Sequence, residues 1–169
     1  MMTDAIRLFL FPALMAFAAF SDLFTMTISN RVSLLLIAGF FVMALLIGMN
    51  GADLLAHMGA GAAVLAVTFT LFACGWIGGG DAKLAAATAL WLGFDPLMTY
   101  LVYASLFGGV LTLAIIRYRL MPLPAFLAGH DWAIRLHRAD AGVPYGIALA
   151  AAALSVYPQT VWMRPLGLG

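Results

Sequence analysis

The feature that most constrains this chain is a series of long apolar runs separated by short polar turns. Of its 169 residues, 65% are hydrophobic and 9% are charged, and the mean hydropathy is +1.07. A soluble domain carries about 25% charged residues. The sequence also lacks the segments of about ten alternating residues that are typical of a membrane β-barrel. We therefore predict an all-α membrane protein, a polytopic bundle of about six transmembrane helices.

Polar breaks and turn residues divide the chain into six apolar segments. The predicted spans are residues 5–20, 32–48, 54–77, 84–94, 97–116 and 143–157. A perpendicular crossing needs about 20 residues, so the shorter segments are expected to extend into the flanking turns or to cross a thinned bilayer. The first run is interpreted as a retained span, because Asp4 offsets the single Arg7 and the positive start of a signal peptide is missing. We expect one membrane-embedded domain over residues 1–169.

The distribution of lysine and arginine predicts the orientation of the bundle. Short loops that are rich in these residues stay in the cytoplasm. With six spans, the odd-numbered turns hold six basic residues and the other side holds two. The prediction places the odd-numbered turns in the cytoplasm and both termini outside. The six are Arg31, Lys83, Arg117, Arg119, Arg135 and Arg138, and the two are Arg7 and Arg164.

Two aspartates stand out because carboxylates are scarce in this chain, which has seven aspartates and no glutamate. Asp81 follows a glycine-rich turn between apolar runs, and a carboxylate beside hydrocarbon is a functional hypothesis by default. Asp22 follows the first span. Because two spans separate Asp22 from Asp81, both are expected at the same, cytoplasmic boundary, where they can face each other across the bundle.

Two such carboxylates can catalyse peptide hydrolysis. When they lie close together they do not both ionise cheaply, so the pair shares a proton. The ionised partner then takes a proton from water while the protonated partner polarises a peptide carbonyl. The alternative interpretation is structural, because an aspartate in a glycine-rich turn is often only a solvated helix cap.

The residues around Asp81 could position a substrate. Gly78, Gly79 and Gly80 have no side chains, so an extended peptide could approach their backbone. Lys83 could bias the charge of Asp81, and Asn30 could add a polar contact, as could Ser21, Thr25 and Thr27. A glycine-rich turn between spans is, however, often only a tight connection.

The motif Gly78-Gly79-Gly80-Asp81-Ala82-Lys83 resembles the Gly-x-Gly-Asp-x-Lys signature of type IV prepilin peptidases, the membrane aspartyl proteases of bacteria. In that family the other catalytic aspartate precedes an Ile-Pro-Asn motif by a few residues. Here Asp22 precedes Ile28-Ser29-Asn30, with Ser29 in place of the proline. Pro144-Tyr145-Gly146 is similar to the family's Pro-Phe/Tyr-Gly turn, so the resemblance covers nearly the whole chain.

The resemblance implies cleavage of short, basic leader peptides from pilin precursors at the cytoplasmic face of the bacterial inner membrane. Asp22 and Asp81 would be the catalytic pair. The chain is most similar to the short, peptidase-only members found with tight-adherence (Flp) pili. We therefore expect no separate methyltransferase domain.

The polar segment 117–142 contains a second candidate binding surface. Residues 131–138 predict a short amphipathic helix on the cytoplasmic surface, with arginines toward anionic lipid headgroups. A positive loop that only fixes the topology fits equally well. Asp131 and Asp140 are the candidates there for contact with a basic leader. His57, near the outer end of the third span, is interpreted as structural.

Other functions remain open at this point. A small proton- or ion-coupled transporter also combines glycine-broken spans with a carboxylate, although its site is expected near the midplane. A non-catalytic subunit of a secretion system is a third interpretation. The sequence predicts no cofactor, no metal ion and no nucleic-acid partner, because it has one cysteine, no third ligand near His130 and His137, and no basic stripe. The partners expected are a prepilin leader and the bilayer, and the oligomeric state is not predicted.

Overall fold

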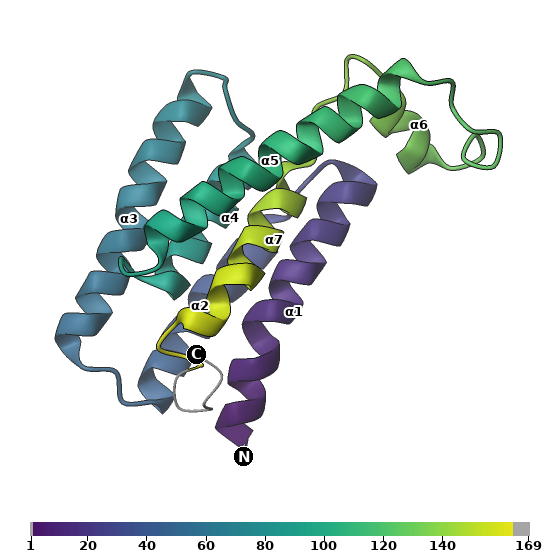
Figure 1. Cartoon of the computed structure of the whole chain (residues 1–169). Coiled ribbons are helices and arrows are strands. Elements are labelled where there is room, and N and C mark those ends of the chain that lie inside the picture. Colours follow the sequence, from purple (N-terminus) through teal and green to yellow (C-terminus); the bar gives the residue numbers. More distant parts are fainter. Residues whose placement is uncertain (1, 164–169) are drawn as a thin grey trace.

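The structure is a computed structural model that describes residues 2–163, and within this range all regular elements are helical (Figure 1). The prediction of an all-α membrane bundle is confirmed. The helices are α1 (Met2–Thr25), α2 (Asn30–Leu46), α3 (Gly51–Ala73), α4 (Gly79–Leu92), α5 (Leu97–Leu120), α6 (Asp131–His137) and α7 (Tyr145–Val156), followed by the short 3-10 helix η1 (Tyr157–Gln159).

The two short helices α4 and α7 form the interior of the bundle. Helix α4 packs against α2, α3 and α7, while α7 packs against α1, α4 and α5. Both are rich in alanine, whose small side chain allows helices to approach closely. Almost every residue of α4 after its first turn is buried. Because other helices bury most residues of α4 and half of those of α7, much of the length of these two helices does not face lipid.

Three helices in the described range are long and apolar enough to cross a membrane: α1, α3 and α5. Helix α2 is apolar but shorter. The prediction of about six spans is therefore met by length and composition for three of them, and for the other three it stays a prediction. Arg164, counted above for the orientation, lies outside the described residues.

The predicted polar break from Ser21 onward is wrong at its start, because α1 continues through Thr25. The Thr25 hydroxyl donates a hydrogen bond to the Ser21 carbonyl (2.7 Å), one helical turn back. The polar side chain thus finds a partner within the helix, and the helix continues past the predicted end of the span. The chain leaves the helix at Met26, which has a left-handed backbone (φ 55°). Asp22 thus lies in the last turn of a helix rather than in a loop.

Candidate active site

Asp22 is held in the last turn of α1 by the start of α7. Its side chain is only 5% exposed, and its Oδ2 accepts a hydrogen bond from the Gly146 N–H at 2.7 Å. The first N–H groups of a helix have no partner within the helix and carry a partial positive charge. The beginning of α7 therefore supplies a donor and a favourable field for a carboxylate that is otherwise buried among apolar groups.

Asp81 occupies the equivalent place at the start of α4. It lies in the first turn of that helix, whose N-cap is Gly78, and a backbone hydrogen bond from Gly78 stabilises its ionised form. Burial opposes ionisation more strongly, and the nearby charge of Asp22 adds to the effect. Together they raise the pKa of Asp81 to about 6. The two inner helices thus begin at the same end of the bundle. Asp81 lies in the first turn of α4, and Asp22 of α1 lies against the first turn of α7.

Ile28, in the turn between α1 and α2, lies against the starts of both inner helices. A Cβ placed on Gly80 would lie 3.1 Å from the Ile28 Cβ, and one placed on Gly146 would lie 2.9 Å from the Ile28 Cδ1. The same Ile28 side chain therefore contacts α4 beside Asp81 and α7 beside Asp22. This apolar contact keeps the two carboxylate-bearing regions together.

The glycines of the α3–α4 turn are required by close packing. A Cβ on Gly79 would lie 3.1 Å from the Phe72 ring, and one on Gly78 would lie 2.8 Å from Oδ2 of Asp81. Together with the Gly80–Ile28 contact, each of the three glycines makes an approach that a side chain would obstruct. Their expected role in positioning a substrate stays a prediction.

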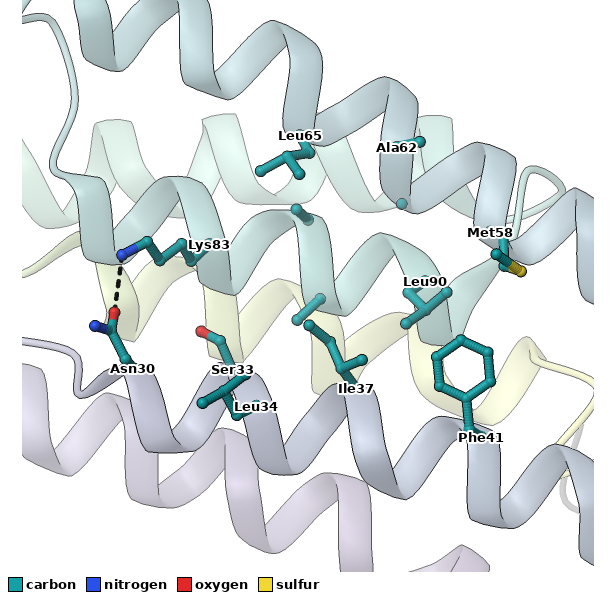
Figure 2. Close-up of a pocket in the computed structure, with 13 residues that line it drawn as sticks. Asn30, Ser33, Leu34, Ile37, Phe41, Met58, Ala62, Leu65, Lys83 and Leu90 are labelled. Carbon is teal, nitrogen blue, oxygen red and sulfur yellow. Dashed lines mark hydrogen bonds between the residues drawn. The ribbon is translucent and has the colours of Figure 1, made fainter.

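Lys83 and Asn30 lie together, but on another side of α4. The Lys83 Nζ donates a hydrogen bond to the Asn30 Oδ1 at 2.9 Å (Figure 2). Two residues along an α-helix are about 200° apart around its axis, so Lys83 and Asp81 project from nearly opposite faces of α4. The structure therefore joins Lys83 to α2 rather than to the aspartates, and the substrate role predicted for Lys83 and Asn30 is not tested.

Ser29, which replaces the proline of the Ile-Pro-Asn motif, adopts the backbone of a proline. Its φ is −64°, close to the value of about −65° that a proline ring imposes. Its side chain accepts a hydrogen bond from the Arg31 N–H at 3.3 Å and caps α2. The substitution therefore keeps the geometry of the turn that carries Ile28.

Gly146 is the site residue that sequence reasoning missed. Beyond donating to Asp22, it has no room for a side chain, because a Cβ would lie 2.8 Å from the Asp22 Oδ2. The available signal was the Pro144-Tyr145-Gly146 motif, in which a proline precedes a helix and the glycine lies in its first turn. That motif was noted only as a resemblance and was given no role.

The predicted amphipathic helix is present as α6 and packs against the end of α1. Arg135 donates a hydrogen bond to the Phe24 carbonyl (2.9 Å), and the Trp132 ring meets the Phe24 ring edge-on. A cation is favourable at a helix C-terminus because it complements the helix dipole. The segment that carries α6 thus braces the last turn of the helix that bears Asp22.

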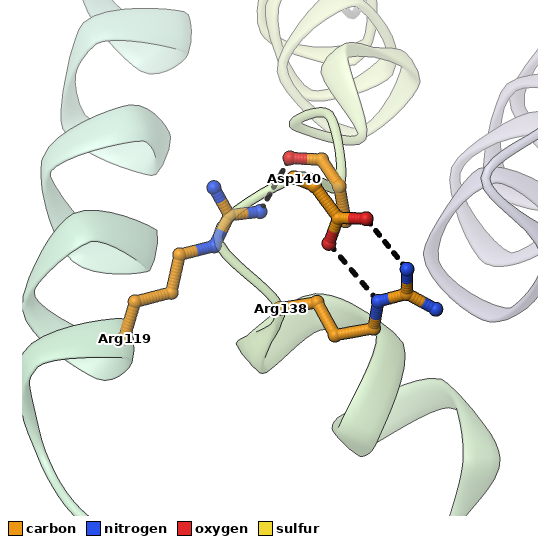
Figure 3. Close-up of polar contacts among 4 residues, drawn as sticks. Arg119, Arg138 and Asp140 are labelled. Carbon is orange, nitrogen blue, oxygen red and sulfur yellow. Dashed lines mark hydrogen bonds and ion pairs between the residues drawn. The ribbon is translucent and has the colours of Figure 1, made fainter.

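Arg119 and Arg138 fix the rest of this segment (Figure 3). Arg119 donates to the carbonyls of Leu136, Ala141 and Gly142 at 2.8–2.9 Å. Arg138 pairs with Asp140, with 3.0 Å between Nε and Oδ1. That hydrogen bond and charge hold the pKa of Asp140 below its usual range. Asp140 is therefore engaged by a neighbour, and its predicted contact with a leader peptide is untested.

Within residues 2–163, no group of three or more His, Cys or Asp side chains is placed to hold a metal ion. The two carboxylates lie close enough for the charge of Asp22 to affect the pKa of Asp81, and both receive a backbone N–H. The negative charge of Asp22 therefore makes Asp81 easier to protonate than an isolated aspartate.

Comparison with known proteins gives one match. The model of the type IV leader peptidase family matches residues 9–113, which is more than half of the chain and includes Asp22 and Asp81. Gly146 and the helix it begins lie outside the matched range. No curated protein and no solved structure matches the chain.

Proposed function

This chain belongs to the type IV leader peptidase family, and from that membership we propose that it is a membrane aspartic endopeptidase for prepilins. Its substrates are the leader peptides of type IV or Flp pilin precursors. Cleavage takes place at the cytoplasmic face of a bacterial inner membrane, with Asp22 and Asp81 as the catalytic pair. The observation that carries this proposal is that both aspartates lie at one end of the bundle, Asp81 in the first turn of α4 and Asp22 against the first turn of α7, with the pKa of Asp81 raised to about 6.

In the mechanism we propose, Asp81 holds the shared proton and Asp22 is ionised. The Gly146 N–H and the start of α7 favour the negative charge on Asp22. Asp22 takes a proton from water as the water oxygen attacks the scissile carbonyl, and Asp81 gives its proton to the carbonyl oxygen. The tetrahedral intermediate then collapses. The C–N bond breaks, the amine leaves with the proton that Asp22 holds, and one hydroxyl group of the intermediate returns a proton to Asp81 as the new carboxyl group forms.

The test is cleavage of a co-expressed small pilin precursor, followed by the shift of the mature pilin on a gel. Asp22→Asn and Asp81→Asn are each expected to abolish the shift at matched expression. Asp95→Asn is the control, because Asp95 is an exposed carboxylate next to the other end of α4. It should cleave like the wild type.

Cleavage that survives in either active-site variant would contradict the two-carboxylate mechanism. Purified protein in detergent with a synthetic leader peptide separates this result from an effect on pilin export. If the pure wild-type protein does not cut the peptide, the peptidase assignment itself fails.

A further inference from the structure

An apolar groove opens on the side of the bundle between α2 and α3. Helix α3 packs almost wholly on α4, and α2 packs on α4 beside it, so the two helices flank α4 without closing over it. The groove has a volume of about 540 Å³. Its walls are lined by Leu34, Ile37 and Phe41 of α2 and by Met58, Ala62 and Leu65 of α3 (Figure 2).

The floor of the groove is one face of α4. Ala86, Ala87 and Leu90 follow Lys83 at the spacing that places residues on the same side of a helix. Asp81 projects from the opposite face. The groove is therefore separate from the two aspartates, although both begin at the same end of α4.

The length of the groove matches one leaflet of a bilayer. From Asn30 to Phe41 it follows twelve residues of α2, and the eleven steps between them span about 16 Å at 1.5 Å per step. The hydrocarbon core of a bilayer is about 30 Å thick, so one leaflet contributes about 15 Å. A helix from another protein that crosses the membrane needs twice the length that the groove offers.

The polar atoms of the groove are at one end. Lys83 Nζ and the Asn30 side chain lie there, and the walls beyond Ser33 are apolar (Figure 2). Lys83 is exposed, and the described residues provide no carboxylate partner for its ammonium group. A positive charge at the mouth of an apolar, leaflet-deep groove is complementary to a molecule with an anionic head and a hydrocarbon chain.

We propose that this groove binds an anionic phospholipid, with one acyl chain between α2 and α3 and the phosphate at Lys83. The inference does not depend on peptidase activity. In a bilayer the groove faces hydrocarbon, so an acyl chain fills it, and Lys83 selects the headgroup. A single lysine near the membrane surface contributes about 1 kcal/mol of attraction to anionic lipid, which is about a fivefold preference.

Native mass spectrometry of the protein, released from micelles with equal amounts of phosphatidylglycerol and phosphatidylcholine of the same chains, measures this preference. The wild type should retain about five times more phosphatidylglycerol. Lys83→Gln should lower the ratio to about one. Arg31→Gln is the matched control, because Arg31 is exposed at the same end of α2 but does not line the groove, and it should keep the preference.

A second pair of variants tests the acyl chain. Ala62→Trp fills the groove and should reduce the amount of bound lipid severalfold, with Ala62→Leu as a smaller blocking change. Ala63→Trp, one residue along α3 and outside the groove, should bind lipid like the wild type. Helix content measured by circular dichroism identifies any variant that is not folded.

An equal ratio of the two lipids in the wild type, or an unchanged ratio in Lys83→Gln, would overturn the proposal. So would equal lipid retention by folded Ala62→Leu and Ala63→Trp. Displacement of the lipid by inorganic phosphate alone would show a simple anion site. Displacement by an apolar transmembrane peptide at lower concentration than by free lipid would show that the groove belongs to a protein helix.

Discussion

The two ends of the inner helices α4 and α7 are surrounded by different kinds of residues. At their start, α4 and α7 meet two carboxylates, four closely packed glycines and Ile28. At the other end, the last turn of α4 is embedded in aromatic rings. There the Trp162 indole donates to the Trp91 carbonyl (2.6 Å), and His57 donates to the Leu90 carbonyl (2.8 Å).

This difference indicates which end of the inner helices contributes favourably to the free energy of folding and which end opposes it. The aromatic end satisfies two carbonyls in the last turn of α4 with ring N–H donors, and the Trp91 and Trp162 rings are fully buried. The aspartate end buries negative charge, and among residues 2–163 no cation lowers the pKa of Asp81, so this burial costs free energy. Groups whose burial costs free energy cluster at functional sites, so we expect catalysis at the aspartate end, while the aromatic end stabilises the bundle.

The largest effect is expected from substitutions at the aspartate end, which should remove activity without unfolding the protein. Asp22→Asn and Asp81→Asn should each lower kcat/KM for leader cleavage by about 10²–10⁴-fold, the contribution of a general acid or base. Because the amide removes a buried charge, Tm in detergent should stay the same or rise. Initial rates and thermal melts on the same samples measure both. A variant that loses activity only because it melts earlier would contradict this assignment.

The next largest effect is expected from a substitution at the aromatic end. Trp91→Ala should lower the free energy of unfolding by about 3–5 kcal/mol, because a fully buried ring is replaced by a cavity and its hydrogen bond to the Leu36 carbonyl is lost. Denaturant titration in detergent measures the loss. Trp76→Ala is the control, since Trp76 is 76% exposed and should change stability by less than about 0.5 kcal/mol. Equal losses in the two variants would remove the distinction between the ends.

A smaller effect tests Gly146. Gly146→Ala places a Cβ 2.8 Å from the Asp22 Oδ2, so it should cost about 1–3 kcal/mol of stability and lower the cleavage rate at least about tenfold by displacing the carboxylate. Gly109→Ala provides the comparison, because that helical position is open and alanine favours helix. A normal cleavage rate in Gly146→Ala would show that Asp22 does not depend on this contact.

The smallest effect concerns pH. In the unfolded chain Asp81 titrates near its ordinary value of 3.8, and in the folded protein its pKa is raised to about 6. Between these values the folded state binds more protons, so its stability should fall as pH rises from about 4 to 6 and then level off. Thermal melts across this range should show the decline in the wild type and a weaker one in Asp81→Asn. Identical profiles would contradict the raised pKa.

Local patterns in the sequence predicted much of this arrangement. Hydropathy located the apolar helices, and counting two spans between the aspartates predicted their common end. The segment 131–138 was correctly interpreted as a short helix, since α6 covers Asp131–His137. These features depend on neighbouring residues and on the number of crossings, both of which can be read along the chain.

Contacts between distant segments could not be predicted in this way. Lipid tails are as apolar as leucine, so hydrophobicity does not determine which membrane helices pack together. The divergence of α2 and α3 and the contact of Gly146 with Asp22 depend on small residues fitting specific neighbours. The end of the first span was predicted too early, because the hydroxyl of Thr25 donates to a carbonyl of α1 and the helix continues through this polar residue.

The hydrogen bond between Gly146 and Asp22 joins residues 124 positions apart. A ribosome makes Asp22 and Asp81 before Gly146, so a nascent chain already carries both aspartates while the donor to Asp22 is still missing. The site is complete only after the last helix has entered the bundle. Under the proposed mechanism, a chain that has not yet packed α7 against α1 lacks the donor that favours the ionised Asp22, so we do not expect it to cleave peptides.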